Sequence, residues 1–382
     1  MTTHRLCALQ KPLSRDATQL LVSNSSTESK LKILKTTRYR MQTSKRTRDI
    51  VTRRSFIGLG GGAIIAAACA RARGMSSAQN ADKLVLPKDT EVRTGGSRMI
   101  EIDGGYHVWT KKVGDAPIKV LLLHGGPGLD HTYFECFEDF LPPNGIEFYY
   151  YDQLDSTNSD KPSDPRLWTV ERFCHEVEAV RKGLGLEEFY LLGHSWGGIL
   201  ATEYALAYPQ NLKGLIISNM AASIPSFEKH FNQLRAALPE DVKKALEKYE
   251  KSGQYEAPEY QKVVFDQLYR QYICRLSPWP EPITRDFRNW NQKIYNYMQG
   301  PNELVCTGTL KDWDRWADLP RIEVKTLVLG AKYDEMSPDD LRKMADLMPN
   351  ARAWISEKGS HFAMYDDQVA YFTELLTFLK PA

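Results

Sequence analysis

The 382-residue chain is poor in cysteine, and its cysteines form no recognisable motif. None of the six stands in a CxxC pair or beside clustered histidines, so the sequence offers no zinc site. Six is also too few for a fold built around disulfides. If the body of the chain is exported, one or two bridges are open to it, and the sequence does not fix their pairing. The candidates are Cys136, Cys174, Cys274 and Cys306.

Long apolar runs are missing as well. Apolar residues make up 42% of the chain and charged residues 26%, which excludes a mostly disordered, collagen-like or multispanning protein. The fifteen uncharged residues at 56–70 fall short of the ~20 that span a bilayer. We therefore expect no membrane span, and the sequence shows no internal repeats.

The body of the chain also lacks excess positive charge. Residues 1–75 hold 15 Lys and Arg against three acidic residues, whereas the net charge of the whole chain is only +2. Residues 76–382 are therefore acidic. Since nucleic-acid phosphates must be met by a positive surface, this argues against a nucleic-acid partner.

The basic tail has the order of an export signal. Arg53 and Arg54 precede the Gly- and Ala-rich run 56–70, which ends in small residues. This resembles a twin-arginine (Tat) signal, so we expect the Tat machinery to export the protein to the periplasm or the outside. Cys69 leaves a lipid anchor open, and Met41 is an alternative start. The competing interpretation of the run is a buried helix, which its glycines disfavour.

Beyond about residue 90, short apolar runs alternate with helical patterns. Runs at 120–123, 147–151, 189–192, 214–218 and 326–330 are typical of buried parallel strands, and a hairpin over 98–111 precedes them. This order predicts an α/β-hydrolase fold with a mostly parallel eight-stranded sheet.

The alternation stops at 221–318, which is rich in tryptophan and tyrosine and mostly helical in period. We interpret it as a helical cap inserted into the fold. The predicted domains are then an N-terminal signal and tail (1–75), a core in two parts (76–220 and 319–382) and the cap.

A nucleophile motif follows one of the predicted strands. Residues 193–197 read Gly-His-Ser-Trp-Gly, between the run 189–192 and a helical stretch, which is the context of a nucleophile elbow. Ser195 needs a base and an orienting acid, and in this fold they come later in the chain. Asp334 follows the predicted strand 326–330, and His361 follows a predicted last strand at 351–355, so we predict a Ser-Asp-His triad.

The oxyanion of such a reaction needs backbone N–H donors. The N–H of Trp196, directly after the nucleophile, is one candidate. The second is predicted in the segment His-Gly-Gly-Pro-Gly at 124–128, with Gly126 as first choice and Gly125 as the alternative.

The segments 124–128 and 193–198 (GHSWGG) resemble the proline iminopeptidase family of serine peptidases, which includes the tricorn-interacting aminopeptidases. The likeness extends from about residue 95 to the C-terminus. It implies a cofactor-free enzyme, a prolyl aminopeptidase that releases an N-terminal residue, often proline, from short peptides. It also implies that Glu303 and Glu335 bind the free α-amino group of the substrate, a task suited to desolvated carboxylates.

One segment departs from the family. Residues 154–160 read Leu-Asp-Ser-Thr-Asn-Ser-Asp where relatives often carry glycines, which puts the preference for proline in doubt more than hydrolysis. The alternatives are an amino-acid amidase, esterase or lactonase on the same scaffold, and, more remotely, a non-catalytic binding protein. Paired glutamates argue against an esterase for neutral substrates, and the complete triad argues against a binding protein.

Overall fold

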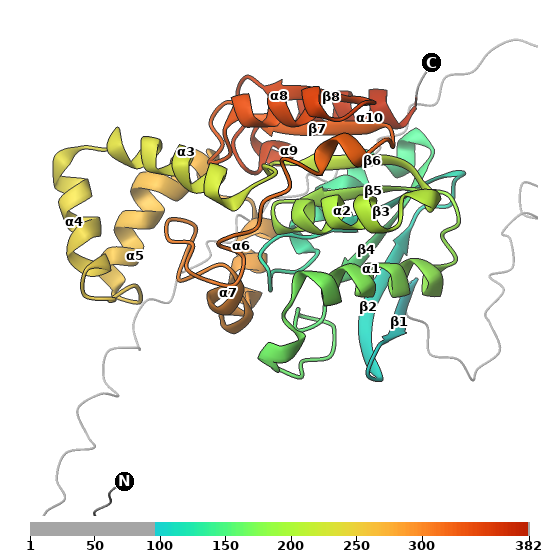
Figure 1. Cartoon of the computed structure of the whole chain (residues 1–382), viewed down its shortest axis with the longest axis horizontal. Coiled ribbons are helices and arrows are strands. Elements are labelled where there is room, and N and C mark those ends of the chain that lie inside the picture. The colour runs from blue at the N-terminus through green and yellow to red at the C-terminus, as the bar shows by residue number, and fades with distance from the viewer. Residues whose placement is uncertain (1–95, 381–382) are drawn as a thin grey trace, which may run out of the picture. The chain divides into compact units, whose positions relative to one another are not determined.

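The computed structural model describes residues 96–380 (Figure 1). Its centre is an eight-stranded sheet in the order β1-β2-β4-β3-β5-β6-β7-β8. The hairpin strands β1 and β2 pair antiparallel, as do β2 and β4, and the remaining neighbours are parallel. The predicted α/β-hydrolase architecture with a mostly parallel sheet is therefore confirmed. The strands are β1 (Ser97–Ile102), β2 (Tyr106–Val113), β3 (Ile118–Leu123), β4 (Ile146–Asp152), β5 (Phe189–His194), β6 (Leu212–Ser218), β7 (Thr326–Ala331) and β8 (Ala351–Ser356).

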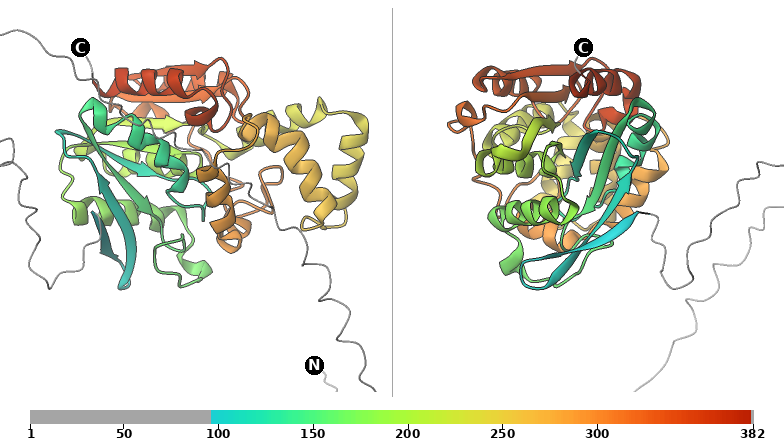
Figure 2. Two further views of the ribbon diagram at one scale, coloured as in Figure 1. Left: turned by 180° about the vertical axis from the view of Figure 1, so that it is seen from behind. Right: turned by 90° about the vertical axis from the view of Figure 1, so that its right-hand side faces the viewer.

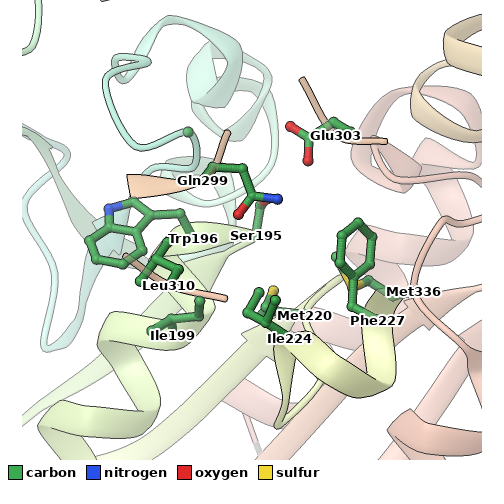
Figure 3. A pocket seen from close by; sticks show the side chains of 11 residues that line it. Ser195, Trp196, Ile199, Met220, Ile224, Phe227, Gln299, Glu303, Leu310 and Met336 are labelled. Carbon is green, nitrogen blue, oxygen red and sulfur yellow. The ribbon is translucent and has the colours of Figure 1, made fainter. Parts of the chain in front are cut away.

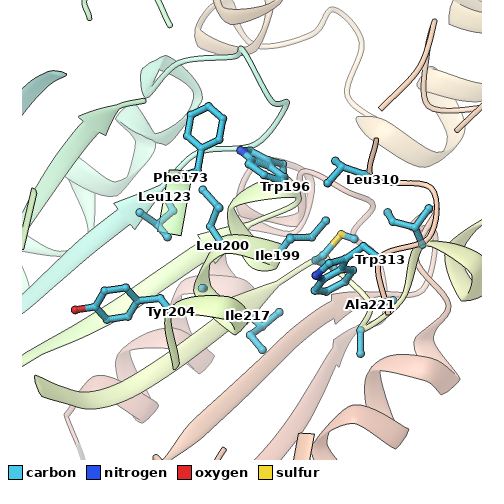
Figure 4. Close-up of a cluster of buried hydrophobic side chains, with 14 of the residues drawn as sticks. Leu123, Phe173, Trp196, Ile199, Leu200, Tyr204, Ile217, Ala221, Leu310 and Trp313 are labelled. Atoms are coloured by element: carbon cyan, nitrogen blue, oxygen red, sulfur yellow. The ribbon is translucent and has the colours of Figure 1, made fainter. Parts of the chain in front are cut away.

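Both faces of the sheet are covered, which explains why its strands are apolar throughout. Successive side chains of a strand point to opposite faces, so Leu121 and Leu123 join one buried cluster while Val120 and Leu122 join the other. The first cluster packs against α1 (Val170–Leu184), α2 (Trp196–Ala207) and α8 (Pro338–Leu347), and Figure 4 shows the α2 side.

The opposite face of the sheet is covered by two further elements. These are η1, a 3₁₀ helix (Thr132–Asp139), and α10 (Gln368–Leu379), which follows the short helix α9 (Ala363–Asp366). Each fully buried large apolar side chain contributes about 1.5–3 kcal/mol.

A helical insertion separates β6 from β7. It holds α3 (Ile224–Ala236), α4 (Glu240–Glu250), α5 (Pro258–Val264), a π-helical stretch η5 (Phe265–Ile273), α6 (Glu281–Asn289) and α7 (Gln292–Met298). Figures 1 and 2 show α3, α4 and α5 to one side of the sheet. The insertion lies within the predicted cap, whose limits at 221 and 318 stay a prediction.

The cap is hydrogen bonded to two loops at the carboxyl ends of the strands. The N–H groups of His361 and Phe362, in the loop after β8, donate to the carbonyls of Tyr272 and Ile273 at 2.9 Å each. On the other side, the N–H of Asn291 donates to Gly128 O at 2.9 Å. The cap therefore holds both loops by backbone contacts, which do not depend on side-chain identity.

The remaining predictions concern the export signal, a membrane span and the cysteines. The export signal, Cys69 and Met41 all lie outside residues 96–380. Within that range no helix is long and apolar enough to cross a membrane. The four cysteines of the body are buried free thiols.

Candidate active site

The nucleophile candidate lies on a sharp turn between β5 and α2. Ser195 has φ 56° and ψ −126°, a conformation rare for a residue with a side chain and typically about 1–3 kcal/mol above the usual regions. The flanking glycines make this turn feasible, because a Cβ at Gly193 would collide with the Gly197 carbonyl, and one at Gly197 with Leu123 O. Local sequence thus places the serine at the carboxyl edge of the sheet, where the predicted elbow requires it.

The predicted acid and base lie together on neighbouring loops. His361 Nδ1 is 2.9 Å from Asp334 Oδ1, and both side chains are almost fully buried. The other carboxylate oxygen, Oδ2, accepts from Asn219 Nδ2 at 2.7 Å. Asp334 is therefore fixed from two sides and can orient the imidazole by its Nδ1–H.

Asn219 is a site residue that the sequence reasoning missed. It directly follows β6 and has φ +54°, a conformation that asparagine tolerates better than most residues. The signal was an asparagine at the end of a buried strand, but its partner lies 115 residues later in the chain.

The elbow and the base loop are adjacent. His194, the residue before the nucleophile, has its Nε2 2.9 Å from the His361 carbonyl, and the two imidazole centroids are 4.8 Å apart. Between residues 96 and 380, no hydrogen bond joins the Ser195 hydroxyl to the His361 ring. Catalytic hydrogen bonds of this kind often tighten only when substrate binds.

The two glycines proposed as oxyanion donors differ in their surroundings. The Gly125 N–H already donates to Tyr133 Oη at 2.6 Å. The Gly126 N–H has no acceptor among the described residues. Trp196 is the first residue of α2, where a backbone N–H has no partner inside the helix. The geometry therefore favours Gly126 with Trp196 over Gly125.

A pocket opens above these residues (Figure 3). Gly126, Ser195 and Trp196 line the pocket, and Figure 3 shows Glu303 on the other side of Ser195 from Trp196. Most of the remaining lining is apolar: Ile199, Met220, Ile224, Phe227, Leu310 and Met336, together with the amide of Gln299.

The two predicted glutamates lie close enough for the charge of Glu303 to act on Glu335. Glu335 is 1% exposed, and neither of its carboxylate oxygens has a hydrogen-bond partner in the described part of the chain. Its Oε1 lies 3.7 Å from His361 Nδ1. Among the described residues no lysine or arginine forms an ion pair with Glu303 or Glu335.

This arrangement disfavours two negative charges. Burial raises the pKa of Glu303, an effect partly offset by the Tyr295 hydroxyl and by His361. Burial and then the charge of Glu303 raise the pKa of Glu335 well above its usual range. A cation entering the pocket would restore both carboxylates to their ionised form.

The segment 154–160 achieves its turn without glycine. Asp155 takes the left-handed conformation at φ 68°, and its buried carboxylate accepts from Trp168 Nε1 at 2.7 Å. Its carbonyl accepts from Asn291 Nδ2 at 2.9 Å, which ties the segment to the cap. None of the seven residues lines the pocket around Ser195. In the described part of the chain, no group of three or more His, Cys, Asp or Glu side chains is arranged to hold a metal ion.

Comparison with known proteins identifies the family and the fold. A family model described as the alpha/beta hydrolase fold matches residues 119–368. The proline iminopeptidases of Flavobacterium johnsoniae and Elizabethkingia meningoseptica are 44% and 45% identical to the chain, each over 72% of this chain and 95% of the relative. The crystal structure of a proline iminopeptidase from Mycobacterium smegmatis has a TM-score of 0.69 at 30% identity, covering 74% of this chain and 97% of that one. Sequence, fold and relatives thus agree that this chain is an enzyme of the proline iminopeptidase family of α/β hydrolases.

Proposed function

We propose that the protein is a serine aminopeptidase that releases an N-terminal residue, preferentially proline, from short peptides. The observation that carries this proposal is a pair of carboxylates at the site: Glu303 lines the pocket of Ser195, and Glu335 is buried beside His361. Within residues 96–380 neither forms an ion pair with a lysine or arginine. Two such groups are unfavourable unless a positive charge enters, and a free N-terminus supplies one. Proline iminopeptidase is also the name of the relatives at 44–45% identity.

The proposed reaction passes through an acyl-enzyme. Ser195 Oγ attacks the first peptide carbonyl while His361 takes its proton, and Asp334 stabilises the imidazolium that forms. The N–H groups of Gly126 and Trp196 bind the oxyanion. The C–N bond breaks, His361 gives its proton to the departing amine, and water then hydrolyses the ester by the same steps in reverse.

The shape and chemistry of the pocket favour proline. A secondary ammonium has two N–H donors, which matches two carboxylates, whereas a primary ammonium has three. The small apolar wall formed by Met220, Ile224 and Phe227 suits a compact ring rather than a polar side chain. The remainder of the peptide leaves after acylation and needs no dedicated pocket.

A comparison of arylamides tests this function. Proline, alanine and N-acetylproline arylamides are compared on purified protein, with a p-nitrophenyl ester and the Ser195→Ala variant as controls. Fast cleavage of free proline arylamide with none of the acetylated one is expected. Preference for alanine would keep the aminopeptidase and change its specificity. Ester cleavage without amide cleavage would favour the esterase or lactonase alternative, and cleavage of the acetylated amide would favour an amidase. No turnover of any substrate would point to a binding protein.

We also propose that residues 1–75 direct Tat-dependent export. The support is the Arg53-Arg54 pair ahead of a short Gly- and Ala-rich run. Replacing both arginines by lysine should retain the precursor inside the cell. N-terminal sequencing of the exported form locates the cleavage site, and loss of lipid labelling in Cys69→Ala would establish an anchor there.

A further inference from the structure

A chain of hydrogen bonds runs beneath the proposed catalytic groups, and Tyr133 is at its centre. Tyr133 lies on η1 and is fully buried. Its hydroxyl is 2.6 Å from the Gly125 N and 3.1 Å from His194 Nδ1. The other ring nitrogen of His194, Nε2, is 2.9 Å from the carbonyl oxygen of His361. One phenol therefore connects the oxyanion loop, the nucleophile elbow and the loop of the base.

The donors and acceptors of this chain can be assigned in one way. A carbonyl oxygen only accepts, so His194 Nε2 carries the proton and donates it to His361 O. His194 Nδ1 is then an acceptor and receives the Tyr133 O–H. The phenol oxygen in turn accepts the Gly125 N–H, which can only donate. Every group is satisfied, and His194 must be neutral. Burial, with His361 nearby, lowers the pKa of His194 well below its usual range, which agrees with this assignment.

Packing fixes the phenol ring as firmly as its hydroxyl. The ring of Tyr133 lies edge-on to Phe362 at a centroid distance of 5.2 Å, and its centroid is also 5.2 Å from that of His194. Phe362 directly follows the proposed base. The hydroxyl therefore has little freedom to move away from Gly125 or His194.

The chain has a consequence for the oxyanion loop. The Gly125 N–H is bound by Tyr133, whereas the N–H of the next residue, Gly126, which lines the pocket, has no acceptor among the described residues. This loop lies close to the nucleophile, because a Cβ on Gly125 would be 3.1 Å from the Ser195 Cβ. A small rotation of this loop would move the donor relative to the attacking oxygen.

We propose that Tyr133 is a positioning residue, which sets the oxyanion loop and the base loop against the nucleophile through its single hydroxyl. The inference rests on the proposed function of Ser195 and Gly126. Tyr133 itself touches neither substrate nor the reacting atoms. Its effect should therefore appear in the transition state, where the alignment of Gly126 matters, and much less in binding of the ground-state substrate.

The test is Tyr133→Phe, which removes the hydroxyl and keeps the ring. Loss of one oxyanion donor costs about 10²–10³-fold in kcat. A displaced donor should cost less, and we expect kcat to fall about 10–100-fold with KM within about twofold. An aldehyde analogue of proline, which forms a tetrahedral adduct with the serine, should bind more weakly by a similar factor. The pH profile of kcat should keep its shape, because no contact of the His361 ring changes.

Tyr204→Phe is the matched control. Tyr204 is equally buried on α2, and its hydroxyl donates to Glu178 at 2.8 Å, away from the pocket. This variant should lose stability comparably and keep wild-type kcat per folded enzyme. A Tyr133→Phe enzyme with wild-type kcat, or with equal losses in kcat and substrate affinity, would overturn the inference.

A second variant covers the case in which Tyr133→Phe does not fold. His194→Gln retains an N–H donor for the His361 carbonyl and removes the ring nitrogen Nδ1, the atom that accepts from the phenol. It should reproduce the loss in kcat, and a folded His194→Gln enzyme with wild-type kcat would also contradict the inference. Failure of the proposed function itself is distinguishable, because Ser195→Ala would then retain activity.

Discussion

The carboxylate pair makes the most discriminating prediction. In Glu303→Gln the side chain keeps its size but loses its charge, so the substrate ammonium faces Glu335 alone. A hydrogen bond to a charged group contributes about 1.5–3 kcal/mol. At 1.4 kcal/mol per factor of ten, KM for proline arylamide should rise about 10–100-fold. The change in kcat should be small, because the glutamate is not among the groups that contact the reacting carbonyl.

The same pair gives the expected pH dependence. Burial raises the pKa of Glu303 and of Glu335, which favours a protonated pair when no substrate is bound, and we expect the ammonium to displace that proton. Binding then releases a proton, so KM should increase as pH falls below the higher pKa of the pair, by up to tenfold per pH unit. In Glu303→Gln, Glu335 no longer has a like charge beside it. This rise in KM should therefore move to lower pH.

Initial rates across pH 5–9 on free and N-acetylated proline arylamides measure both effects. Glu228→Gln is the matched control, since Glu228 lines the neighbouring pocket with Glu303 and does not line the pocket of Ser195. The role of the pair would be refuted by an unchanged KM in Glu303→Gln, or by an equal effect on the acetylated substrate, which carries no ammonium.

Three further predictions concern individual groups of the site. Glu335→Gln should raise the free energy of unfolding at neutral pH by about 1–2 kcal/mol, because a carboxyl with a raised pKa destabilises the fold once pH exceeds its unfolded pKa. The variant should have the same Tm as the wild type at pH 4 and a higher Tm at pH 8. An equal Tm at pH 8 would contradict the assignment. Ser195→Ala should abolish turnover. Because alanine relieves little of the positive-φ strain, the circular dichroism spectrum and the Tm should stay near those of the wild type. Residual cleavage above background would exclude the serine as nucleophile. Asn219→Ala should reduce kcat about tenfold through the lost 2.7 Å bond to Asp334, and recovery of kcat in Asn219→Gln but not in Asn219→Leu would separate hydrogen bonding from packing.

The features of the fold that could be predicted are those that depend on short stretches of sequence. Buried parallel strands appear as apolar runs, and the elbow appears as two glycines around a serine, because both depend on neighbours within a few residues. The triad order follows from the same strand pattern. The mostly helical insertion could be expected from its periodicity, although the π-helical stretch Phe265–Ile273 could not.

The contacts that tune the site depend on long-range folding and were invisible to this reasoning. Asn219 and Asp334 are separated by 115 residues, and His194 and His361 by 167. The choice between Gly125 and Gly126 was open in the sequence because both offer an adjacent amide. Only the position of a phenol on η1 distinguishes them. The roles assigned to the site residues stay predictions until the variants above are measured.

The backbone bonds between the cap and the loops have a consequence for engineering. A cap exchanged from another hydrolase would have to present carbonyls where Tyr272 and Ile273 do, or the histidine loop would lose its support even with every catalytic side chain intact. Within residues 96–380, no backbone hydrogen bond joins the outer helices α4 and α5 to His361 or Gly128. Substitutions that alter which peptides enter can therefore accumulate in α4 and α5. The parts of the insertion that bond to the loops of His361 and Gly128 can change only together with those loops.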